Sequence, residues 1–521
     1  MANHDSLSGA HALAECYGDP LDDLDRSLWQ LFSQAALKYP EHEAIVSLWQ
    51  RDTEYPDHVV RHAAGSPGAV FRPLRWTYQT LLDHSNRLVV WLRGRGCIPG
   101  MCLVGVFWNS IEWALFFWAA AKLEMTFVPV DPRLVATDAE FFLGALAPAV
   151  LVVQDSDAEN ALEQGASTIL EKIPLRISCA DHPNKGWIPL PRSAMEMSFC
   201  PNPPQDHAVE RSDCCDSARV TPNGSSSDKI SLIVFTSGTT SKPKGCLHTA
   251  RNLQAQAHNY DHDSGRFERW LVHTPVSHIF AVNNSLRAWQ NGDTVVFASS
   301  SFDVEATVCA LVQEQCTFMS AIPALVKAIL GHPKFPGKDA LKLSYVTLGS
   351  TLISESDIKL CQESLGSCHA IQAFGMSEGA PVVSWTRVDP LLVDGYHPGV
   401  GKVLPGAAMR ICAPGERKPL ERNQLGELHI GGPAVITGYL NGVDSESFYH
   451  DHVGNWLMTG DQALIDQDGV LHILGRYKDV IIRAGENIAP SKIEATLAEI
   501  PGLVVRSRNS ILHLCLADGC W

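Results

Sequence analysis

The chain carries no excess of basic residues. Its 41 Lys and Arg side chains stand against 57 Asp and Glu, which gives a net charge of −16 at pH 7. A charge of this sign repels phosphate backbones, so nucleic acid is not expected as the main partner. No local basic patch is visible that would reverse this expectation.

The sequence also lacks a signal peptide and an uninterrupted apolar stretch. Residues 1–15 have neither the basic start nor the apolar run of a signal peptide. Polar and charged residues interrupt the most apolar region, 101–130, so no membrane span is expected. We predict a soluble cytoplasmic protein. The chain ends without a peroxisomal tripeptide, but a peroxisomal location stays open for an intact form.

No paired cysteine spacing of the kind found in zinc sites occurs. The 15 cysteines are scattered through the chain and follow no secretory signal, so we interpret them as reduced thiols. Hydrophobic residues make up 45% of the 521 positions, which is enough to bury a large core. A length of this order favours about three to four compact units.

Strand and helix patterns alternate along most of the chain. An apolar run at 102–108, a helical pattern at 111–123 and a second run at 126–130 predict a strand–helix–strand unit in a covered parallel sheet. Further strands are predicted at 231–235, 270–274, 294–297, 317–321, 343–348 and 370–374, with helices at 304–314 and 355–364. This alternation indicates an α/β fold with right-handed crossovers.

Three regions break the alternation. Residues 195–229 are polar and rich in turn signals, as in a linker or surface insertion. Residues 391–474 contain short strands separated by Gly, Pro and Asn-Gly, which predict a small antiparallel or barrel-like β unit. A capping box at Ser491 and Glu494 predicts one further helix, which Pro501 ends.

A run of small hydroxyl residues, glycine and lysine follows the strand at 231–235. It reads Thr-Ser-Gly-Thr-Thr-Ser-Lys-Pro-Lys-Gly over residues 236–245. Backbone N–H groups and hydroxyls in such a turn can approach a phosphate closely, and the two lysines supply positive charge. Pro243 stands where a Walker A loop has its second glycine, so the run is not a Walker loop. Taken alone, a run of this composition is more often a solvated surface loop.

This run resembles the phosphate-binding signature of the adenylate-forming superfamily and departs from it only at Ser241. The superfamily includes acyl- and aryl-CoA ligases, luciferases and peptide-synthetase adenylation domains. Other segments resemble its motifs in the same order: 127–131, 348–352, 374–378, 426–428, 438–440, 459–461 and 475–479. The resemblance covers about residues 25 to 502.

The resemblance implies a reaction in which ATP activates a carboxylic acid as an acyl-adenylate, which then passes to coenzyme A. The residues that it implies for ATP binding are Thr236, Ser237, Gly238, Thr239, Thr240, Ser241, Lys242, Lys244, Gly349, Ser350, Phe374, Gly375, Met376, Ser377, Asp461 and Arg476. Within this set Thr239 and Lys244, together with Glu378, are implied to be catalytic, and Thr239 and Glu378 to hold Mg²⁺, a cation that prefers oxygen ligands. The simpler alternatives are that Asp461 is a turn residue and Arg476 a surface cation.

The resemblance further implies an acid-binding pocket, a hinge and a domain boundary. His278 and Phe374 would border the acid, although a lone His is as often a packed residue. No carboxylate occurs from His273 to Ala281 to bind an α-amine, so an acid without an α-amino group and coenzyme A as acceptor are favoured over a carrier protein. Lys478 would be the hinge between an N-terminal AMP-binding domain, 1–475, and a small α+β C-terminal domain, 476–521.

The chain departs from the family pattern at its end. The lysine-containing segment that closes the family's C-terminal domain has no counterpart after Lys492, which suggests a truncated domain. Loss of one donor to a charged transition state costs about 10²–10³ in rate. We therefore predict ATP binding with poor adenylation. Pyrophosphate exchange at the rate of a version with a complete domain would contradict this.

Three other functions stay open, one of which is a luciferase-type oxidation after adenylation. Residues 375–379 fit the Gly-x-Ser-x-Gly pattern of serine hydrolases, with Ser377 as nucleophile, but Pro381 and two β-branched residues follow where a helix is required. A non-catalytic binder of nucleotide or acyl-adenylate is the second alternative. The sequence names neither the acid nor the oligomeric state.

Overall fold

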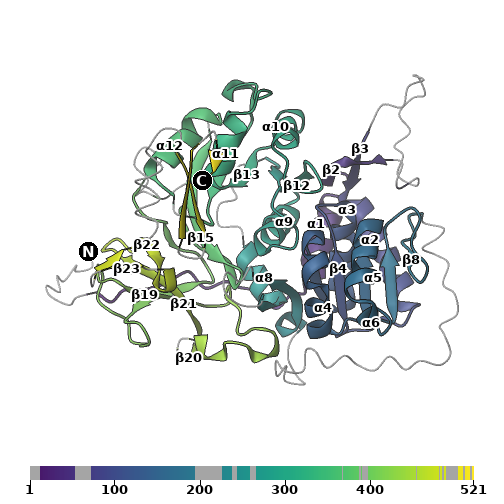
Figure 1. The fold of residues 1–521 in the computed structure, drawn as a ribbon, viewed down its shortest axis with the longest axis horizontal. Helices are drawn as coiled ribbons and strands as arrows, with labels where there is room; N and C mark the ends of the chain where they lie inside the picture. Colours follow the sequence, from purple (N-terminus) through teal and green to yellow (C-terminus); the bar gives the residue numbers. More distant parts are fainter. Residues whose placement is uncertain are drawn as a thin grey trace, which may run out of the picture.

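The computed structural model describes residues 12–52, 55, 72–193, 226–236, 243–258, 266–351, 353–366, 368–386, 389, 397–452 and 454–479, and the backbone of five short strands after residue 480. Three large sheets organise the described part. Figure 1 shows the first sheet and its helices in blue at the right, the second at the upper centre, and the third in yellow-green at the lower left.

The first sheet has seven strands in the order β10-β9-β5-β4-β6-β7-β8. Its strands are β4 (Cys102–Val106), β5 (Thr126–Val130), β6 (Val150–Val153), β7 (Leu175–Ser178), β8 (Ile188–Pro189), β9 (Ile230–Phe235) and β10 (Gly245–Thr249). Its strands pair in parallel except at the β9–β10 hairpin, which is antiparallel. Helix α4 (Pro132–Leu146) follows β5, and helices α5 (Ser156–Gly165) and α6 (Ser167–Leu170) follow β6.

The second sheet has nine strands in the order β17-β16-β15-β14-β13-β11-β12-β2-β3. They are β2 (Glu43–Arg51), β3 (Pro73–Thr77), β11 (Arg269–Leu271), β12 (Thr294–Phe297), β13 (Phe318–Ala321), β14 (Tyr345–Leu348), β15 (His369–Met376), β16 (Gly379–Ser384) and β17 (Lys402–Val403). The associated helices are α1 (Leu28–Lys38), α2 (Tyr78–Arg93), α8 (Ala250–Ala257), α9 (Ile279–Asn291), α10 (Val304–Gln313), α11 (Pro323–Leu330) and α12 (Glu355–Ser364). The strands from β15 to β2 run parallel, and β16, β17 and β3 are antiparallel additions at the edges.

Helix α3 (Ile111–Leu123) packs between these two sheets. Its Ser110 cap accepts a hydrogen bond from Trp113 N, and 11 of its 13 residues are buried. A helix that is apolar on every side must be enclosed on every side. Trp118 stacks on Phe32 of α1 with ring centroids 4.3 Å apart and packs edge-on to Trp289 of α9 at 5.4 Å. The two sheets therefore share one aromatic core.

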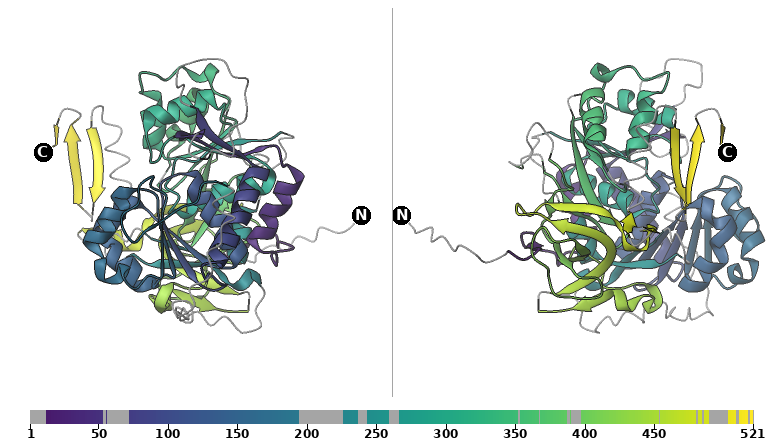
Figure 2. Two further views of the ribbon diagram at one scale, coloured as in Figure 1. Left: turned by 90° about the vertical axis from the view of Figure 1, so that its right-hand side faces the viewer. Right: turned by 60° about the vertical axis from the view of Figure 1, so that its left-hand side comes forward.

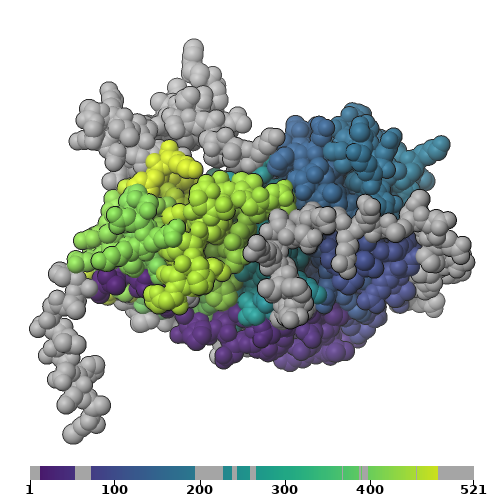
Figure 3. All heavy atoms as spheres, turned by 90° about the horizontal axis from the view of Figure 1, so that it is seen from below, coloured from purple at the N-terminus to yellow at the C-terminus, as the bar shows by residue number. Residues whose placement is uncertain are grey.

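The third sheet is antiparallel. Its six strands are β1 (Glu15–Tyr17), β18 (Ala408–Cys412), β19 (Gly426–Gly431), β20 (Phe448–His450), β21 (Asn455–Ile465) and β22 (Leu471–Arg476). The right-hand view of Figure 2 brings this sheet forward. Figure 3 shows the purple N-terminal segment beside its green surface, where β1 pairs with β18.

The barrel-like form predicted for residues 391–474 is wrong, because the described strands do not close. The edge strands β1 and β20 pair only with β18 and β21, and β22 pairs with β21 rather than returning to β1. The antiparallel part of the prediction is confirmed. The sequence pattern did not indicate that a strand from the chain's start would join this sheet.

Most predicted elements of the α/β part are confirmed within a few residues. The helices at 111–123 and 355–364 and the strands at 126–130 and 294–297 match. The strand predicted at 270–274 ends at Leu271, because a turn containing Pro275, which lacks an N–H, follows. Most of the predicted linker and the helix predicted after Pro490 lie outside the described residues. None of the described helices is long and apolar enough to cross a membrane.

Candidate active site

The carboxyl ends of the parallel strands in both α/β sheets meet at one place. Ligands in open α/β sheets commonly bind outside these ends. Thr236 follows β9 of the first sheet, Gly349 follows β14 of the second, and Phe374 lies in the last part of β15, which ends at Met376. A hydrogen bond of 2.9 Å from His248 Nε2 on β10 to the backbone oxygen of Ser377 joins the two sheets here.

The ends of the predicted phosphate loop are fixed to one another. Thr236 N donates to Lys244 O at 2.9 Å, and Lys244 N donates to Thr236 Oγ1 at 3.2 Å. These bonds close the neck of the β9–β10 hairpin. The predicted residues Ser237, Gly238, Thr239, Thr240, Ser241 and Lys242 lie outside the described residues.

Lys244 has an anionic partner in the described structure. Its Nζ forms an ion pair with Asp444 Oδ2 and lies 5.2 Å from the centroid of the Tyr439 ring. Both side chains of the ion pair are partly exposed, so an incoming anion can compete with the Asp444 carboxylate. Lys244 is thus positioned at the mouth of the hairpin, beside the segment that contains Tyr439.

Glu378 is a buried carboxylate in the turn between β15 and β16. Its exposed fraction is 6%, and its Oε1 accepts a hydrogen bond of 2.6 Å from the hydroxyl of Tyr439. Burial and the Glu378 charge raise the pKa of Tyr439, which keeps its phenol protonated and able to donate. No described residue donates to Glu378 Oε2, so this oxygen is available to a cation.

Two residues of this site were missed by sequence reasoning. Tyr439 lies in the motif at 438–440, but nothing in the sequence showed that its hydroxyl would reach Glu378, 61 positions away. His248 is enclosed on β10, and burial lowers the pKa of its imidazole to about 4, so the neutral ring donates through Nε2. No motif around His248 indicated this role.

The turn that holds Ser377 and Glu378 requires close backbone approach. A Cβ atom on Gly375 would lie 2.7 Å from Ala380 Cα, which explains the glycine. Met376 pairs with Gly379 across the turn. The chain then continues into the strand β16, whereas a serine nucleophile elbow continues into a helix. The hydrolase alternative therefore lacks its required geometry.

Gly349 and Ser350 lie beside Phe374. The parallel register pairs Leu348 with Gln372, which brings the following residues of both strands together. A Cβ on Gly349 would lie 2.9 Å from the backbone oxygen of Ala373, so only glycine fits without a shift. Ser350 then adopts a left-handed conformation with φ 63°, which turns the chain away from the sheet.

Asp461 and Arg476 face each other across β21 and β22. Arg476 Nε donates to Asp461 Oδ1 at 3.0 Å, and Asp461 N donates to Thr459 Oγ1 at 3.0 Å. Asp461 is buried, and burial raises the pKa of its carboxyl, with Arg476 acting in the opposite direction and the nearby Glu378 charge adding to the rise. Asp461 is thus more than a turn residue, and Arg476 is paired on one side and exposed on the other.

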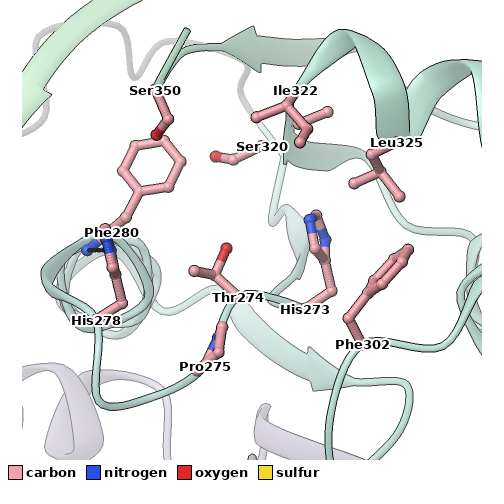
Figure 4. Close-up of a pocket in the computed structure, with 11 residues that line it drawn as sticks. His273, Thr274, Pro275, His278, Phe280, Phe302, Ser320, Ile322, Leu325 and Ser350 are labelled. Atoms are coloured by element: carbon pink, nitrogen blue, oxygen red, sulfur yellow. Dashed lines mark hydrogen bonds between the residues drawn. The ribbon is translucent and has the colours of Figure 1, made fainter. Parts of the chain in front are cut away.

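A cavity of about 260 Å³ opens next to Ser350 (Figure 4). The residues that line it include His273, Thr274, Pro275, His278, Phe280, Phe302, Ser320, Ala321, Ile322, Leu325 and Ser350. His278 caps α9, where its Nδ1 accepts a hydrogen bond of 3.3 Å from Phe280 N. It therefore has a structural role as well as a place on the cavity wall. No lysine, arginine, aspartate or glutamate is among these lining residues.

Lys478 lies in a short 3₁₀ turn, Tyr477–Asp479, directly after β22, and its side chain is exposed. The described part of the chain contains no group of three or more His, Cys, Asp or Glu side chains that could hold a metal on their own. A cation at Glu378 would therefore share its coordination with other oxygens, such as those of a bound phosphate.

Residues 33–440 match the family model described as AMP-binding enzyme, which is more than half of the chain. The chain belongs to the AMP-binding enzyme family. This family's α/β fold accounts for the two parallel sheets and for the motifs that converge between them.

Other AMP-binding enzymes resemble the chain over most of its length. An acyl–CoA ligase from Pestalotiopsis microspora is 26% identical over 94% of this chain and 85% of its own. An acyl-CoA ligase from Aspergillus fumigatus is 27% identical over 93% of this chain and 78% of its own. Among solved structures, ATP-bound MatB from Rhodopseudomonas palustris is similar in fold, with a TM-score of 0.68, 20% identity, and coverage of 92% of this chain and 84% of that one.

Proposed function

We propose that the protein is an AMP-forming acid–CoA ligase. The observation that carries this proposal is the continuity of two sites: the cluster of Lys244, Glu378 and Tyr439, and the uncharged cavity that begins at Ser350. Ser350 lies beside Phe374, three residues before Ser377, so a nucleotide held at the cluster would reach the mouth of the cavity. The acyl-CoA ligases among the relatives support the same reaction.

The proposed first step is attack of the acid's carboxylate on the α-phosphate of ATP, with loss of pyrophosphate. Negative charge crowds the reacting centre in such a step, so catalysis depends on positioning and on electrostatic stabilisation. Lys244 and the backbone of the hairpin turn would hold the outer phosphates after displacing Asp444. Phe374 would stack on the adenine, and Asp461 would accept hydrogen bonds from the ribose hydroxyls.

The donor set at Glu378 fits Mg²⁺. Magnesium prefers carboxylate, phosphate and water oxygens, and it usually binds through one or two carboxylates together with substrate phosphates. Glu378 offers one oxygen without a described protein donor, while Tyr439 fixes the orientation of the other. Thr239 is the second proposed ligand. Bound there, Mg²⁺ would neutralise phosphate charge.

The proposed second step transfers the acyl group to coenzyme A. Acyl-CoA ligase relatives support this acceptor rather than a carrier protein. We propose the boundary between the AMP-binding and C-terminal domains at residue 475, with Lys478 as the hinge. Its exposed position after the last long strand pair, β21–β22, is compatible with a change of backbone angles at that point.

The cavity supports an uncharged acyl group. A second carboxylate or an amine would lose its hydration there without gaining a charged partner from the lining residues. Its volume of about 260 Å³ is below the usual range for drug-sized ligands, roughly 300–1,000 Å³. A compact monocarboxylic acid therefore fits better than a long chain.

The test is a panel of compact carboxylic acids assayed for AMP release with ATP and Mg²⁺, with and without coenzyme A. We expect AMP with at least one acid, and formation of the corresponding acyl-CoA when coenzyme A is present. A Glu378→Gln variant is the matched control for contaminating enzymes. ATP binding without AMP release for any acid would favour the non-catalytic binder and overturn the proposal.

A further inference from the structure

One side chain in the cavity has unmet hydrogen-bonding capacity. Nδ1 of His273 is enclosed by protein atoms, and no described residue forms a hydrogen bond with it. The other ring nitrogen, Nε2, also forms no hydrogen bond to a described residue. The ring projects into the cavity, with its centroid 5.7 Å from that of Phe302 at an interplanar angle of 61° (Figure 4).

This imidazole is neutral under ordinary conditions. Burial lowers the pKa of His273 to about 4. A neutral ring does not attract a second carboxylate. Instead its accessible nitrogen, Nε2, is a donor in one tautomer of the ring and an acceptor in the other, which suits an uncharged polar group.

The surroundings explain why a hydroxyl is the matching group. Phe302, Ile322 and Leu325 form the apolar wall near His273 in Figure 4, and they offer no competing polar contact. Ser320 Oγ accepts a hydrogen bond of 2.9 Å from Asn284 Nδ2, which leaves its own proton free to donate. A hydroxyl both donates and accepts, so it can satisfy His273 alone or His273 and Ser320 together.

The position of His273 sets where the hydroxyl lies on the acid. In Figure 4, Ser350 is on one side of the cavity, and His273, Phe302 and Leu325 are on the other. Ser350 adjoins Phe374, the proposed adenine contact, so the carboxylate would enter from the Ser350 side. The far end of the acid would then meet His273.

We infer that the acid carries a hydroxyl group at the end remote from its carboxylate, and that His273 binds this hydroxyl. This inference rests on the proposed function only for the direction in which the acid enters. A buried polar group without a partner is costly, so the cavity disfavours acids that leave His273 unpaired. Sites built around a substrate hydroxyl reject analogues that lack it for the same reason.

The experiment compares matched acids that differ only in this hydroxyl. We would use 4-hydroxybenzoate against benzoate, and 5-hydroxypentanoate against pentanoate, with the full chain. Two readouts are measured: kcat/KM for AMP release, and the affinity of each acid by calorimetry, which needs no turnover. We expect the hydroxylated member of at least one pair to be favoured by about tenfold or more, the range for one hydrogen bond in a buried site.

Three variants show which residue is responsible. His273→Phe keeps a ring of similar size without nitrogen, and we expect it to abolish or reverse the preference. His273→Gln restores a side chain that can donate and accept, and should recover part of it. Phe302→Leu changes the apolar wall but keeps His273. The ratio of kcat/KM, and of affinity, between the hydroxylated acid and its matched analogue should therefore persist.

The outcomes separate the two claims. Equal or better binding of the acids without the hydroxyl in both pairs, or a preference that survives in His273→Phe, overturns the inference. A preference in the binding measurements together with no AMP release for any acid overturns the proposed function and supports the inference.

Discussion

The contact between Glu378 and Tyr439 combines a buried carboxylate with a single fixed donor. Tyr439 orients one oxygen of Glu378 without neutralising its charge, because the phenol stays protonated. The two residues should therefore have separable effects: Glu378 supplies the charge, and Tyr439 supplies the geometry.

We expect Glu378→Gln to lower kcat for AMP release by about 10²–10³, the typical cost of removing one preorganised electrostatic group. Tyr439→Phe should have a smaller effect, about tenfold, expressed mainly as a higher Mg²⁺ concentration for half-maximal rate. Magnesium titrations of both variants check this. A Tyr439→Phe loss as large as that of Glu378→Gln would contradict the separation of roles.

His248 predicts a dependence of stability on pH. Its pKa is about 4 in the folded protein and near 6.5 in an unfolded chain. Between these values the unfolded state binds a proton that the folded state does not, so stability falls as the pH drops from about 6.5 to 4. This residue contributes up to about 1.4 kcal/mol per pH unit.

The comparison is urea unfolding of the native protein and of His248→Gln between pH 7 and pH 4.5. Gln can keep the hydrogen bond to Ser377 O but does not titrate. We expect the free energy of unfolding to fall less steeply with decreasing pH in the variant. The difference between the two slopes should correspond to nearly one proton taken up on unfolding. The pKa of His273 is also lowered in the folded state, so this residue contributes to the pH dependence of both proteins. Its contribution cancels when the two slopes are subtracted. Identical slopes would show that His248 is not the titrating group.

For single residues, the sequence predicted which residues belong to the motifs better than it predicted the residues that form hydrogen bonds with them. Gly349 and Gly375 each occupy a place where a Cβ would meet backbone atoms, which explains why the motifs contain glycine. Tyr439 and His248 were not predicted, because their contacts join residues 61 and 129 positions apart and leave no local pattern. His273 was noted only as the start of a stretch without carboxylates.

Among the elements, strands β2, β3 and β11 of the second sheet are linked by a cluster of four charges. Arg269 on β11 and Arg75 on β3 both pair with Glu43 and Glu314, at distances of 2.5 to 3.0 Å. Glu314, which follows α10, is buried, whereas the arginines are partly exposed. The cluster ties the start of two strands to the end of a helix.

Glu314→Gln should destabilise the protein by roughly 2–3 kcal/mol, because it leaves two guanidinium groups sharing one carboxylate in a partly buried site. Full burial of such a pair would cost about 3–5 kcal/mol when one partner is removed. Urea unfolding at pH 7 measures the change. The control is Lys359→Gln in α12, whose ion pair with Glu355 is exposed and should contribute less than about 1 kcal/mol. An equal change in both variants would contradict the role assigned to the cluster.

Apolar runs and end signals predicted the α/β elements well, since α3, β5 and β12 are apolar runs and serine caps mark the starts of α3 and α12. They did not predict how the third sheet is built. The turn signals between its short strands indicate antiparallel pairing, but closure depends on which edges meet. The pairing of β1 with β18 joins residues almost 400 positions apart, and no local signal specifies such a contact.

For the whole molecule, the important feature is that the nucleotide motifs lie on two sheets, and that the hydrogen bond from His248 to Ser377 links the sheets close to these motifs. Ligand bound to the folded state stabilises the regions that it contacts, by about 2.7 kcal/mol at 100 times Kd. ATP should therefore act on the β9–β10 hairpin and on the β15–β16 turn together, although they are far apart in sequence.

Hydrogen exchange with and without ATP and Mg²⁺ measures this. We expect slower exchange in residues 230–249 and in residues 373–384, and little change in β18 and β19. In Glu378→Gln, ATP and Mg²⁺ should slow hydrogen exchange less in both segments, and by similar proportions. Protection of the hairpin alone would show that the two sheets do not share the nucleotide.

The ion pair between Lys244 and Asp444 gives this lysine a counterion from the protein itself. An arriving triphosphate exchanges one anion for another at this lysine instead of meeting a bare cation. The long-range electrostatic attraction between the site and an anion is therefore smaller. Selectivity for the nucleotide then depends on short-range contacts that a simple inorganic anion cannot make. Inorganic phosphate should therefore compete weakly for this site. A nucleotide still binds, because its adenine, ribose and bound magnesium make contacts in addition to its charge.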